Sequence, residues 1–487
     1  MPDSTAFYLT ILAASAAGLA VLAASRFTDR LKVPLPAVLL ALAAVVAHAV
    51  PGLRPADNRI VPEVVSVALV AVLFDGGMRI GWSRFRSQAG PILTVGVLGT
   101  FGTAAAGAVV ARYALGVDWY AAVLLATAVS PTDPAVVFSV LGRRQLAGGS
   151  GTLLEGESGA NDPVGIALMA ALIAGGGVSA SGAVHALGTF ALQMGVGAAV
   201  GYLGGKLLLL AMRRLSLPDE GLYPLRTLAG AYLLYGAASA AHGSGFLAVF
   251  VAGIVLGDER APYKREIEHF HGAVSSLGEL VAFAVLGLTI DVHLLGRVST
   301  WLPGLAIGAA LALVIRPLVV GACLARSKLS GAERRFVQFA GLKGAVPILL
   351  GSYIFSARVA SPARLYEIVV VVVAFSVLVQ GGLVGPVARR LGLPVHLVLP
   401  EPWTLGVRLR DEPQNVHRVV VAPGAPADGA VVAELPGLPE DAWVSLLVRE
   451  GQLLPVRGST TLRAGDQLTV LADRSGAEAL RSCFEGG

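Results

Sequence analysis

Ionisable side chains are sparse in the first 400 residues of this 487-residue chain, and a few of them stand inside long apolar stretches. Among these are two carboxylates, Asp133 and Asp162, and two cations, Arg316 and Lys343. A charge at the centre of a bilayer costs roughly 2.5 to 3.5 kcal/mol, so each such residue is a candidate functional group. A carboxylate in a partly dry site can hold either a proton or a dehydrated alkali cation. The set therefore indicates ion binding inside a membrane.

Two of these charges coincide with residues that interrupt helices. Asp133 lies within Ser130-Pro131-Thr132-Asp133-Pro134, where two prolines remove backbone donors and clash with the preceding turn. Lys343 lies within Gly341-Leu342-Lys343-Gly344-Ala345-Val346-Pro347. The two interruptions fall seven apolar spans apart, as inverted repeats of six-helix halves around a linking helix would place them. We therefore expect two broken helices that cross near the bilayer midplane.

Helical spacing separates the polar residues of Glu157-Ser158-Gly159-Ala160-Asn161-Asp162. Ser158 and Asp162 are four residues apart and share one face, whereas Glu157 shares a neighbouring face with Asn161. The two carboxylates therefore point in different directions and can have different roles.

Asp162 and Ser158 are expected to supply oxygen atoms toward the break at residues 130–134. There the freed carbonyl of Thr132 can complete an oxygen shell around a cation. Glu157 needs a cationic partner, and Arg316, in the middle of another apolar stretch, is the expected one.

The composition indicates which kind of secondary-structure elements position these residues. Apolar residues make up 55% of the chain and charged residues only 14%, which excludes a soluble globular enzyme. About 20 helical residues cross a bilayer, and about thirteen apolar stretches approach or reach this length. They span residues 6–26, 33–50, 62–80, 89–113, 118–141, 152–175, 182–212, 222–241, 244–257, 272–296, 301–325, 333–356 and 365–388.

Loop charges give an expected orientation. One alternate set of loops contains 19 Lys and Arg residues and the other set contains 6. Because cytoplasmic loops collect basic residues, we expect the N-terminus outside and the C-terminal part in the cytoplasm. The first span lacks the features of a cleaved signal, so it is expected to be retained.

The last part of the chain has a different composition. Residues 401–487 hold 8 basic and 12 acidic residues, and short β-rich runs at 418–421, 443–448, 453–456 and 467–471 precede an expected helix at 475–484. This pattern predicts a small α+β domain at 400–487 after an all-α membrane domain at 1–392. No dinucleotide-binding glycine motif follows its strands, and no nucleophile–base or metal-binding pattern indicates an enzyme or a cofactor.

At these motifs the chain resembles the first monovalent cation:proton antiporter family, and within it the potassium/proton antiporter branch of the CvrA or NhaP type. The tail, with Gly465-Asp466-Gln467-Leu468, resembles the TrkA-C (RCK_C) regulatory module of potassium transport proteins. The resemblance covers residues 6 to 472, and Lys343 stands where many members have arginine. The family resemblance rests on the motifs Leu73-Phe74-Asp75-Gly76-Gly77, Thr132-Asp133-Pro134, Glu157 to Asp162, Arg316-Pro317 and Gly341 to Pro347.

The resemblance implies a role for each of these residues. Asp162 would carry the cation or the proton, Ser158 and the Thr132 backbone would be further cation ligands, and Asp133 would reach the ion through water. Glu157 and Arg316 would form a structural ion pair, supported by Asn161 and Lys343. Asp75 and Glu279 are candidates for the inner access path, with structural roles equally open.

The family resemblance also implies a homodimer in the inner (cytoplasmic) membrane that serves pH and ion homeostasis, with lipid as its surroundings and no nucleic-acid partner. The expected activity is electroneutral exchange of K⁺ for H⁺, with a small-molecule regulator at the tail as a family-level possibility. Two alternatives stay open from the sequence: Na⁺/H⁺ exchange by the same residues, and a potassium-channel-like protein gated by its tail. No selectivity filter of the Thr-Val-Gly-Tyr-Gly kind supports the channel alternative.

Overall fold

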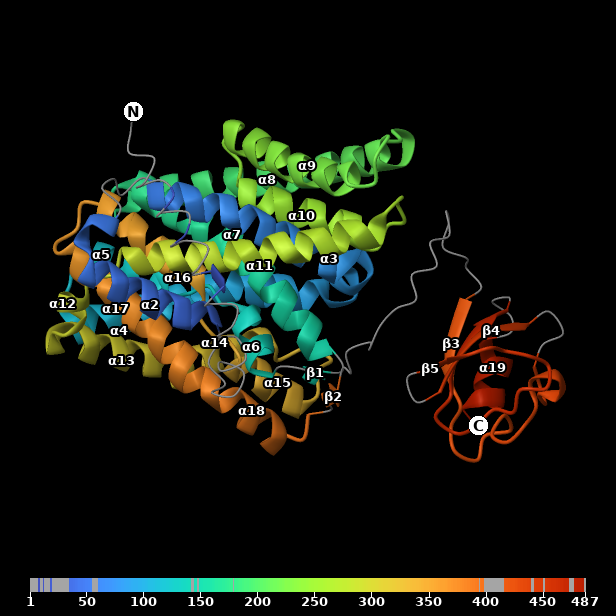
Figure 1. Cartoon of the computed structure of the whole chain (residues 1–487). Helices are drawn as coiled ribbons and strands as arrows, with labels where there is room; N and C mark the ends of the chain where they lie inside the picture. Colours follow the sequence, from blue (N-terminus) through green and yellow to red (C-terminus); the bar gives the residue numbers. More distant parts are fainter. Residues whose placement is uncertain are drawn as a thin grey trace. The chain divides into compact units, whose positions relative to one another are not determined.

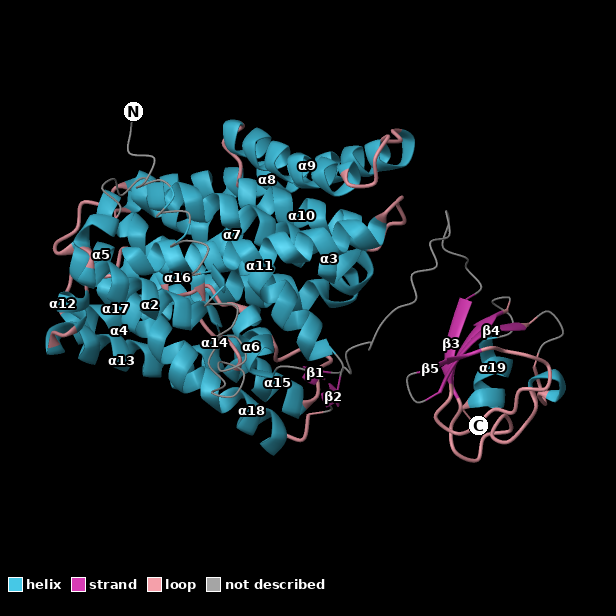
Figure 2. Cartoon of the chain, in the orientation of Figure 1, coloured by secondary structure: helices cyan, strands magenta, loops and turns pink. Residues whose placement is uncertain are grey.

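The chain forms two compact units, Met1–Val398 and Leu399–Gly487, in the computed structural model (Figure 1). The first is almost entirely helical and the second is a small α+β domain (Figure 2), as predicted. The structure describes residues 8, 12, 18–19, 35–54, 60–141, 144–146, 149–177, 179–393, 395–397, 416–438, 442–449, 452–472 and 477–485. Most of the predicted first span, 6–26, lies outside these residues.

The first half of the membrane unit follows the predicted spans from 33–50 onward. Its elements are α2 (Leu35–Ala49), η1 (Pro51–Leu53), α3 (Ile60–Leu93), the π-helical turn η2 (Thr94–Gly99), α4 (Thr100–Leu115), α5 (Trp119–Ala128), α6 (Pro134–Leu141), the short strand β1 (Arg144–Leu146), α7 (Gly149–Gly175) and α8 (Ala180–Arg214). Strand β1 pairs with β2 (Val395–Leu397), which follows the last helix of the unit.

The second half contains both short and long helices. They are α9 (Leu222–Ala240), α10 (Gly245–Gly257), α11 (Lys264–Leu288), α12 (Val292–Leu295), α13 (Val298–Ala310), the π-helical turn η3 (Leu311–Ile315), α14 (Arg316–Cys323), α15 (Gly331–Phe339), α16 (Ala345–Tyr353), η4 (Ile354–Ser356), α17 (Pro362–Phe375), the π-helical turn η5 (Ser376–Gln380) and α18 (Gly381–Arg390).

Long apolar helices are consistent with a bilayer-spanning unit. Within the described residues, five helical stretches are long and apolar enough to cross a membrane: Ile60–Leu115, Ala180–Arg214, Lys264–Gly287, Val298–Cys323 and Pro362–Arg390. The first of them is two helices, because Gly81 in α3 adopts φ +66° and bends the chain. The side chain of Asp258 occupies the space where a Cβ of Gly81 would stand, which only glycine permits. Helix α3 packs along α10 and α11 (Figure 1).

One predicted span is displaced in the structure. The interval 272–296 corresponds to α11, which begins at Lys264 and ends at Leu288. Asp291 then caps the short helix α12 by accepting a hydrogen bond from the backbone N–H of His293. Apolar content alone extended the prediction across this cap.

Two helices are interrupted where the prolines and glycines predict it. The chain is non-helical at residues 130–133, between α5 and α6, and at 340–344, between α15 and α16. The two extended segments meet, because the backbone N–H of Asp133 donates to the carbonyl of Leu342 at 2.7 Å.

The second unit is an antiparallel sheet covered by one helix. The strands are β3 (Val416–Val420), β4 (Trp443–Arg449), β5 (Gln452–Leu454) and β6 (Gln467–Leu471), in the order β3-β6-β4-β5, with η6 (Val432–Glu434) and α19 (Ala477–Phe484). Val419 lies opposite Leu468 in the sheet, and both are buried with Leu447, Val470 and Phe484 in a separate core.

Candidate cation site

The crossing of the two interrupted helices brings charged side chains to the ends of four short helices. The amine of Lys343 donates to the carbonyls of Ser130 at 2.9 Å and Pro131 at 3.1 Å, just beyond the C-terminal end of α5. A cation is favourable there, because the carbonyls at a helix C-terminus carry partial negative charge.

The Asp133 carboxylate occupies the complementary position. Asp133 directly precedes α6, and its side chain lies against the backbone of Gly344, which precedes α16. Helix N-termini carry partial positive charge. The two opposite charges therefore neutralise the helix ends that the breaks expose in the middle of the bundle.

A buried ion pair connects α7 to α14. Arg316 donates to Glu157 through Nη1 at 2.8 Å and Nη2 at 3.0 Å, and Nη2 also donates to the carbonyl of Val337 at 3.2 Å. Both side chains are almost completely buried. The structure thus brings together the two residues that we expected to pair.

The side chain of Thr132 joins this ion pair to the first break. Its hydroxyl donates to Glu157 at 3.3 Å and accepts from the amide of Asn161 at 2.8 Å, and its backbone N–H lies 3.4 Å from the Asn161 carbonyl oxygen. Asn161 and Glu157 therefore hold the extended segment at residues 130–133 from the side of α7. The sequence placed these two residues on one helix face but did not identify Thr132 as their partner.

Asp162 lies at the midpoint of α7, and both it and Ser158 are buried. Asp162 is close enough to Asp133 and Lys343 for electrostatic interaction with both. The predicted cation-binding residues Thr132, Asp133, Ser158 and Asp162 are thus all buried or half-buried on α7 and the first break.

The predicted access-path residues lie on α3 and α11. Asp75 is buried and pairs with the Arg79 guanidinium at 2.8 Å, one helical turn away. Glu279, on α11, interacts electrostatically with both Asp133 and Arg79. Asp75 and Glu279 therefore share Arg79 as a neighbouring cation, and Glu279 also lies within electrostatic range of the first break.

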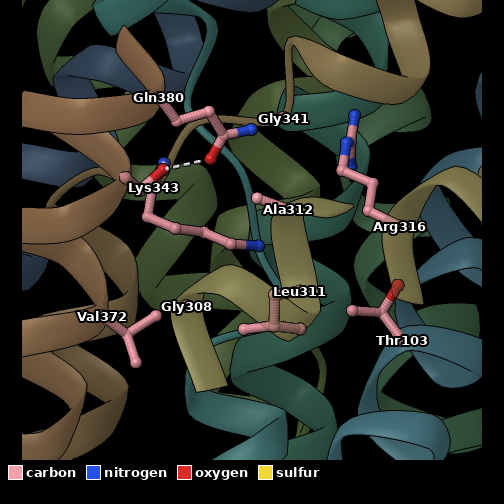
Figure 3. Close-up of a pocket in the computed structure, with 10 residues that line it drawn as sticks. Thr103, Gly308, Leu311, Ala312, Arg316, Gly341, Lys343, Val372 and Gln380 are labelled. Carbon is pink, nitrogen blue, oxygen red and sulfur yellow. Dashed lines mark hydrogen bonds between the residues drawn. The ribbon is translucent and has the colours of Figure 1, made fainter. Parts of the chain in front are cut away.

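The π-helical turn η5 positions the second break through residues that sequence reasoning missed. Ser376 accepts the backbone N–H of Lys343 at 3.0 Å and donates to Gln380 at 3.0 Å, and Gln380 donates to the carbonyl of Phe339 at 2.6 Å. Figure 3 shows Gln380, Lys343 and Arg316 around a pocket of about 10 Å³, which has room for one water. The available signal was a polar pair four residues apart within the apolar run that follows Glu367.

The fold and this site define a polytopic membrane protein with crossed, broken helices, an architecture that secondary transporters use to bind ions at the midplane. Residues 17–390 match the family described as sodium/hydrogen exchanger, transmembrane, and residues 416–484 match the TrkA-C domain. The chain belongs to the sodium/hydrogen exchanger family, and the predicted family resemblance is confirmed.

Relatives with assigned names agree with this family. The chain is 33% identical over 471 residues to the K(+)/H(+) antiporter NhaP2 of Shewanella sp. strain MR-4, covering 94% of this chain and 80% of that protein. It is 32% identical over 397 residues to the K(+)/H(+) antiporter NhaP of Alkalimonas amylolytica, covering 80% of this chain and 68% of the relative.

A solved structure shares the fold. The sodium proton antiporter MjNhaP1 from Methanocaldococcus jannaschii aligns with a TM-score of 0.65 at 21% identity, covering 78% of this chain and 99% of that one.

Proposed function

We propose that the protein exchanges K⁺ for H⁺ by letting the two ions compete for Asp162. In the cation-loaded state, the carboxylate of Asp162, the hydroxyl of Ser158 and the backbone carbonyl of Thr132 surround the ion, and Asp133 contacts it through water. In the proton-loaded state Asp162 is neutral and the cation leaves. Exclusive occupancy couples the K⁺ flux to the H⁺ flux, because each change of the side to which the site opens carries one ion or the other.

The observation that carries this proposal is the crossover beside Asp162. Lys343 is bound to the carbonyls of Ser130 and Pro131, and Asp133 lies against Gly344, so the helix ends are already neutralised. The charge on Asp162 is therefore the one that an arriving cation or proton can balance. Glu157 is committed to Arg316 and has a structural role.

The named relatives favour potassium over sodium. Two relatives that align with 94% and 80% of this chain are K(+)/H(+) antiporters by name, whereas the Na(+)/H(+) antiporter NhaH of Halobacillus aidingensis aligns with 68% of it at 29% identity. Sodium remains the alternative cation, since carboxylate, hydroxyl and carbonyl oxygens bind both ions. Buried carboxylates at a helix crossover favour a carrier over a channel.

The loop charges and the C-terminal domain support a proposed location, orientation and assembly. We place residues 1–392 in the cytoplasmic membrane as the transport domain, with the N-terminus outside. Residues 400–487 would be a cytoplasmic regulatory domain that binds a small molecule, and the assembly would be a homodimer that serves pH and ion homeostasis.

The test measures proton efflux from acidified inside-out vesicles while potassium, sodium, lithium and rubidium are added in turn to the outside. We expect a response to potassium and its loss in Asp162→Asn, with the variant protein still folded and inserted. Asp219→Asn, in an exposed loop where an amide oxygen can still accept from Gly221, is the matched control. Full transport by Asp162→Asn would overturn the mechanism, and a response to sodium alone would overturn the assignment of potassium.

A further inference from the structure

A cavity of about 130 Å³ lies at the opposite end of α3 from the Asp75–Arg79 pair. Its wall includes Arg54, Val61 and Ser352. It also includes Thr289, directly after α11, and Tyr366 of α17. Val61 and Asp75 are 14 residues apart on α3, which corresponds to about 21 Å along the helix axis. We call this end of the bundle the Arg54 end.

The residue after Tyr366 is a carboxylic acid that the exchange mechanism above does not use. Glu367 is 1% exposed. Its Oε1 accepts the backbone N–H of Asp291 at 2.6 Å, while its Oε2 has no hydrogen-bond partner in the described part of the chain. Beside it, the hydroxyls of Tyr366 and Thr289 are hydrogen-bonded to each other on the cavity wall.

The charged groups around Glu367 leave it without a close countercharge. From the neighbouring turn, the Asp291 carboxylate adds a like charge, and Arg54, exposed and on the cavity wall, is the cation that interacts with it electrostatically. Among the packed helices, α13 has no titratable side chain, α5 contributes only Tyr120 and α16 only Tyr353. His293 of α12 is exposed.

An ionised carboxylate oxygen that is buried without a donor is costly, so the neutral acid suits this environment. A proton on Oε2 removes that cost and leaves Oε1 to accept from Asp291.

We propose that Glu367 is a second proton-binding site, which exchanges its proton with the solution through the cavity at the Arg54 end. The cavity wall includes Tyr366 and not Glu367 itself, so the Oε2 proton leaves to water that enters from the cavity past Tyr366, and a proton from the solution at that end later replaces it. When that half of the bundle opens, the same water passes protons to or from Asp162. This inference rests on the proposed exchange function and adds to it a group that acts at one end of the bundle.

The variant Glu367→Gln tests the site, because an amide keeps an oxygen acceptor for the Asp291 N–H but cannot exchange a proton. Transport is measured in proteoliposomes of uniform orientation, with the pH varied on one side at a time. We expect the pH dependence of the rate to weaken in the variant when the pH is varied on the Arg54 end, and to stay as in wild type when the pH is varied on the other end. An exposed acid in the first turn of α3 gives the control variant, Glu63→Gln, which should behave as wild type on both ends.

Two results would overturn the proposal. One is a wild-type pH profile on both ends, and the other is an equal change on both ends with a lower unfolding temperature, which indicates a structural role. If wild-type proteoliposomes show no exchange at all, the proposed function fails instead.

Carbodiimide modification gives a readout that requires neither transport nor a folded variant. An apolar carbodiimide reacts with buried protonated carboxyl groups, and peptide mass spectrometry of the wild-type chain locates the adduct. We expect Glu367 to be modified, and more slowly as the pH rises. A wild-type chain with no adduct at Glu367 at any pH would contradict a proton held there.

Discussion

At the scale of single residues, the Glu157–Arg316 pair is a bidentate ion pair buried in the site. Two hydrogen bonds join the side chains, and a third fixes the guanidinium to the carbonyl of Val337. Gly341 packs so closely on the guanidinium that a Cβ there would overlap it. The arginine therefore holds α7, α14 and the second break together.

Removal of Arg316 should destabilise the transport domain. Arg316→Ala leaves Glu157 buried without its countercharge, a change that typically costs about 3 to 5 kcal/mol. Thermal unfolding of the detergent-solubilised protein should show a much lower midpoint than wild type. Arg297→Ala, at the exposed start of α13, is the control. An unchanged midpoint for Arg316→Ala would show that the ion pair does not stabilise the fold.

Sequence reasoning predicted this pair because two opposite charges buried in apolar spans need each other. It could not predict the hydrogen bonds of Thr132 or the contacts of Ser376 and Gln380. A hydroxyl or an amide in an apolar helix has many possible partners, and the choice depends on packing between helices distant in sequence. A buried charged side chain therefore has far fewer possible partners than a buried hydroxyl or amide has.

At the scale of secondary-structure elements, the two breaks depend on each other. The Asp133–Leu342 backbone hydrogen bond joins them, and Lys343 reaches across to two carbonyls of the first break. The close contact between Asp133 and Gly344 leaves no space for a side chain at residue 344.

Gly344→Ala should therefore disable transport. Its Cβ would overlap the Asp133 carboxylate, so one of the two breaks must move and the cation ligands with it. Gly331→Ala is a matched control in the first turn of α15, where a Cβ meets no atom within 4 Å. Vesicle proton flux should be lost in the first variant and kept in the second. Equal flux in both would show that the crossover tolerates displacement.

Both interruptions were predictable because proline and glycine act through local backbone geometry. The end of α11 was not, because residues 289–296 are apolar enough to continue a span and the Asp291 cap depends on a local hydrogen bond. The bend at Gly81 likewise involves contact with Asp258, which directly follows α10 and is distant in sequence.

At the scale of the whole molecule, the two units have separate cores and separate sources of stability. In the tail, Asp466 is 1% exposed. Burial alone would raise its pKa, but hydrogen bonds from the Arg449 side chain at 2.7 and 2.8 Å and from the Arg463 N–H hold the pKa of Asp466 below its usual range.

The tail should therefore lose stability in acid. Because the folded-state pKa is lowered, Asp466 contributes stability above its unfolded pKa of about 3.9, and this contribution disappears as the pH falls through the folded-state value. Hydrogen exchange of β6 in the full chain, corrected for intrinsic rates, should show this loss. Asp466→Asn should lower protection at neutral pH and reduce the acid dependence, whereas Glu434→Gln should not. Identical acid profiles for wild type and Asp466→Asn would contradict this assignment.

The net charge of the transport site predicts how the whole molecule responds to membrane voltage. Asp162 with a monovalent cation and Asp162 with a proton have the same charge, and the residue beside it, Asn161, is neutral. If Lys343 stays protonated on the carbonyls of Ser130 and Pro131, a one-for-one cycle moves no net charge and voltage does no work on it. The reversal point of exchange in proteoliposomes should then stay constant as the imposed membrane potential changes. A reversal point that follows the potential would require another titrating group in the cycle. The buried amine would be the first to test, by Lys343→Arg, because arginine keeps its proton throughout.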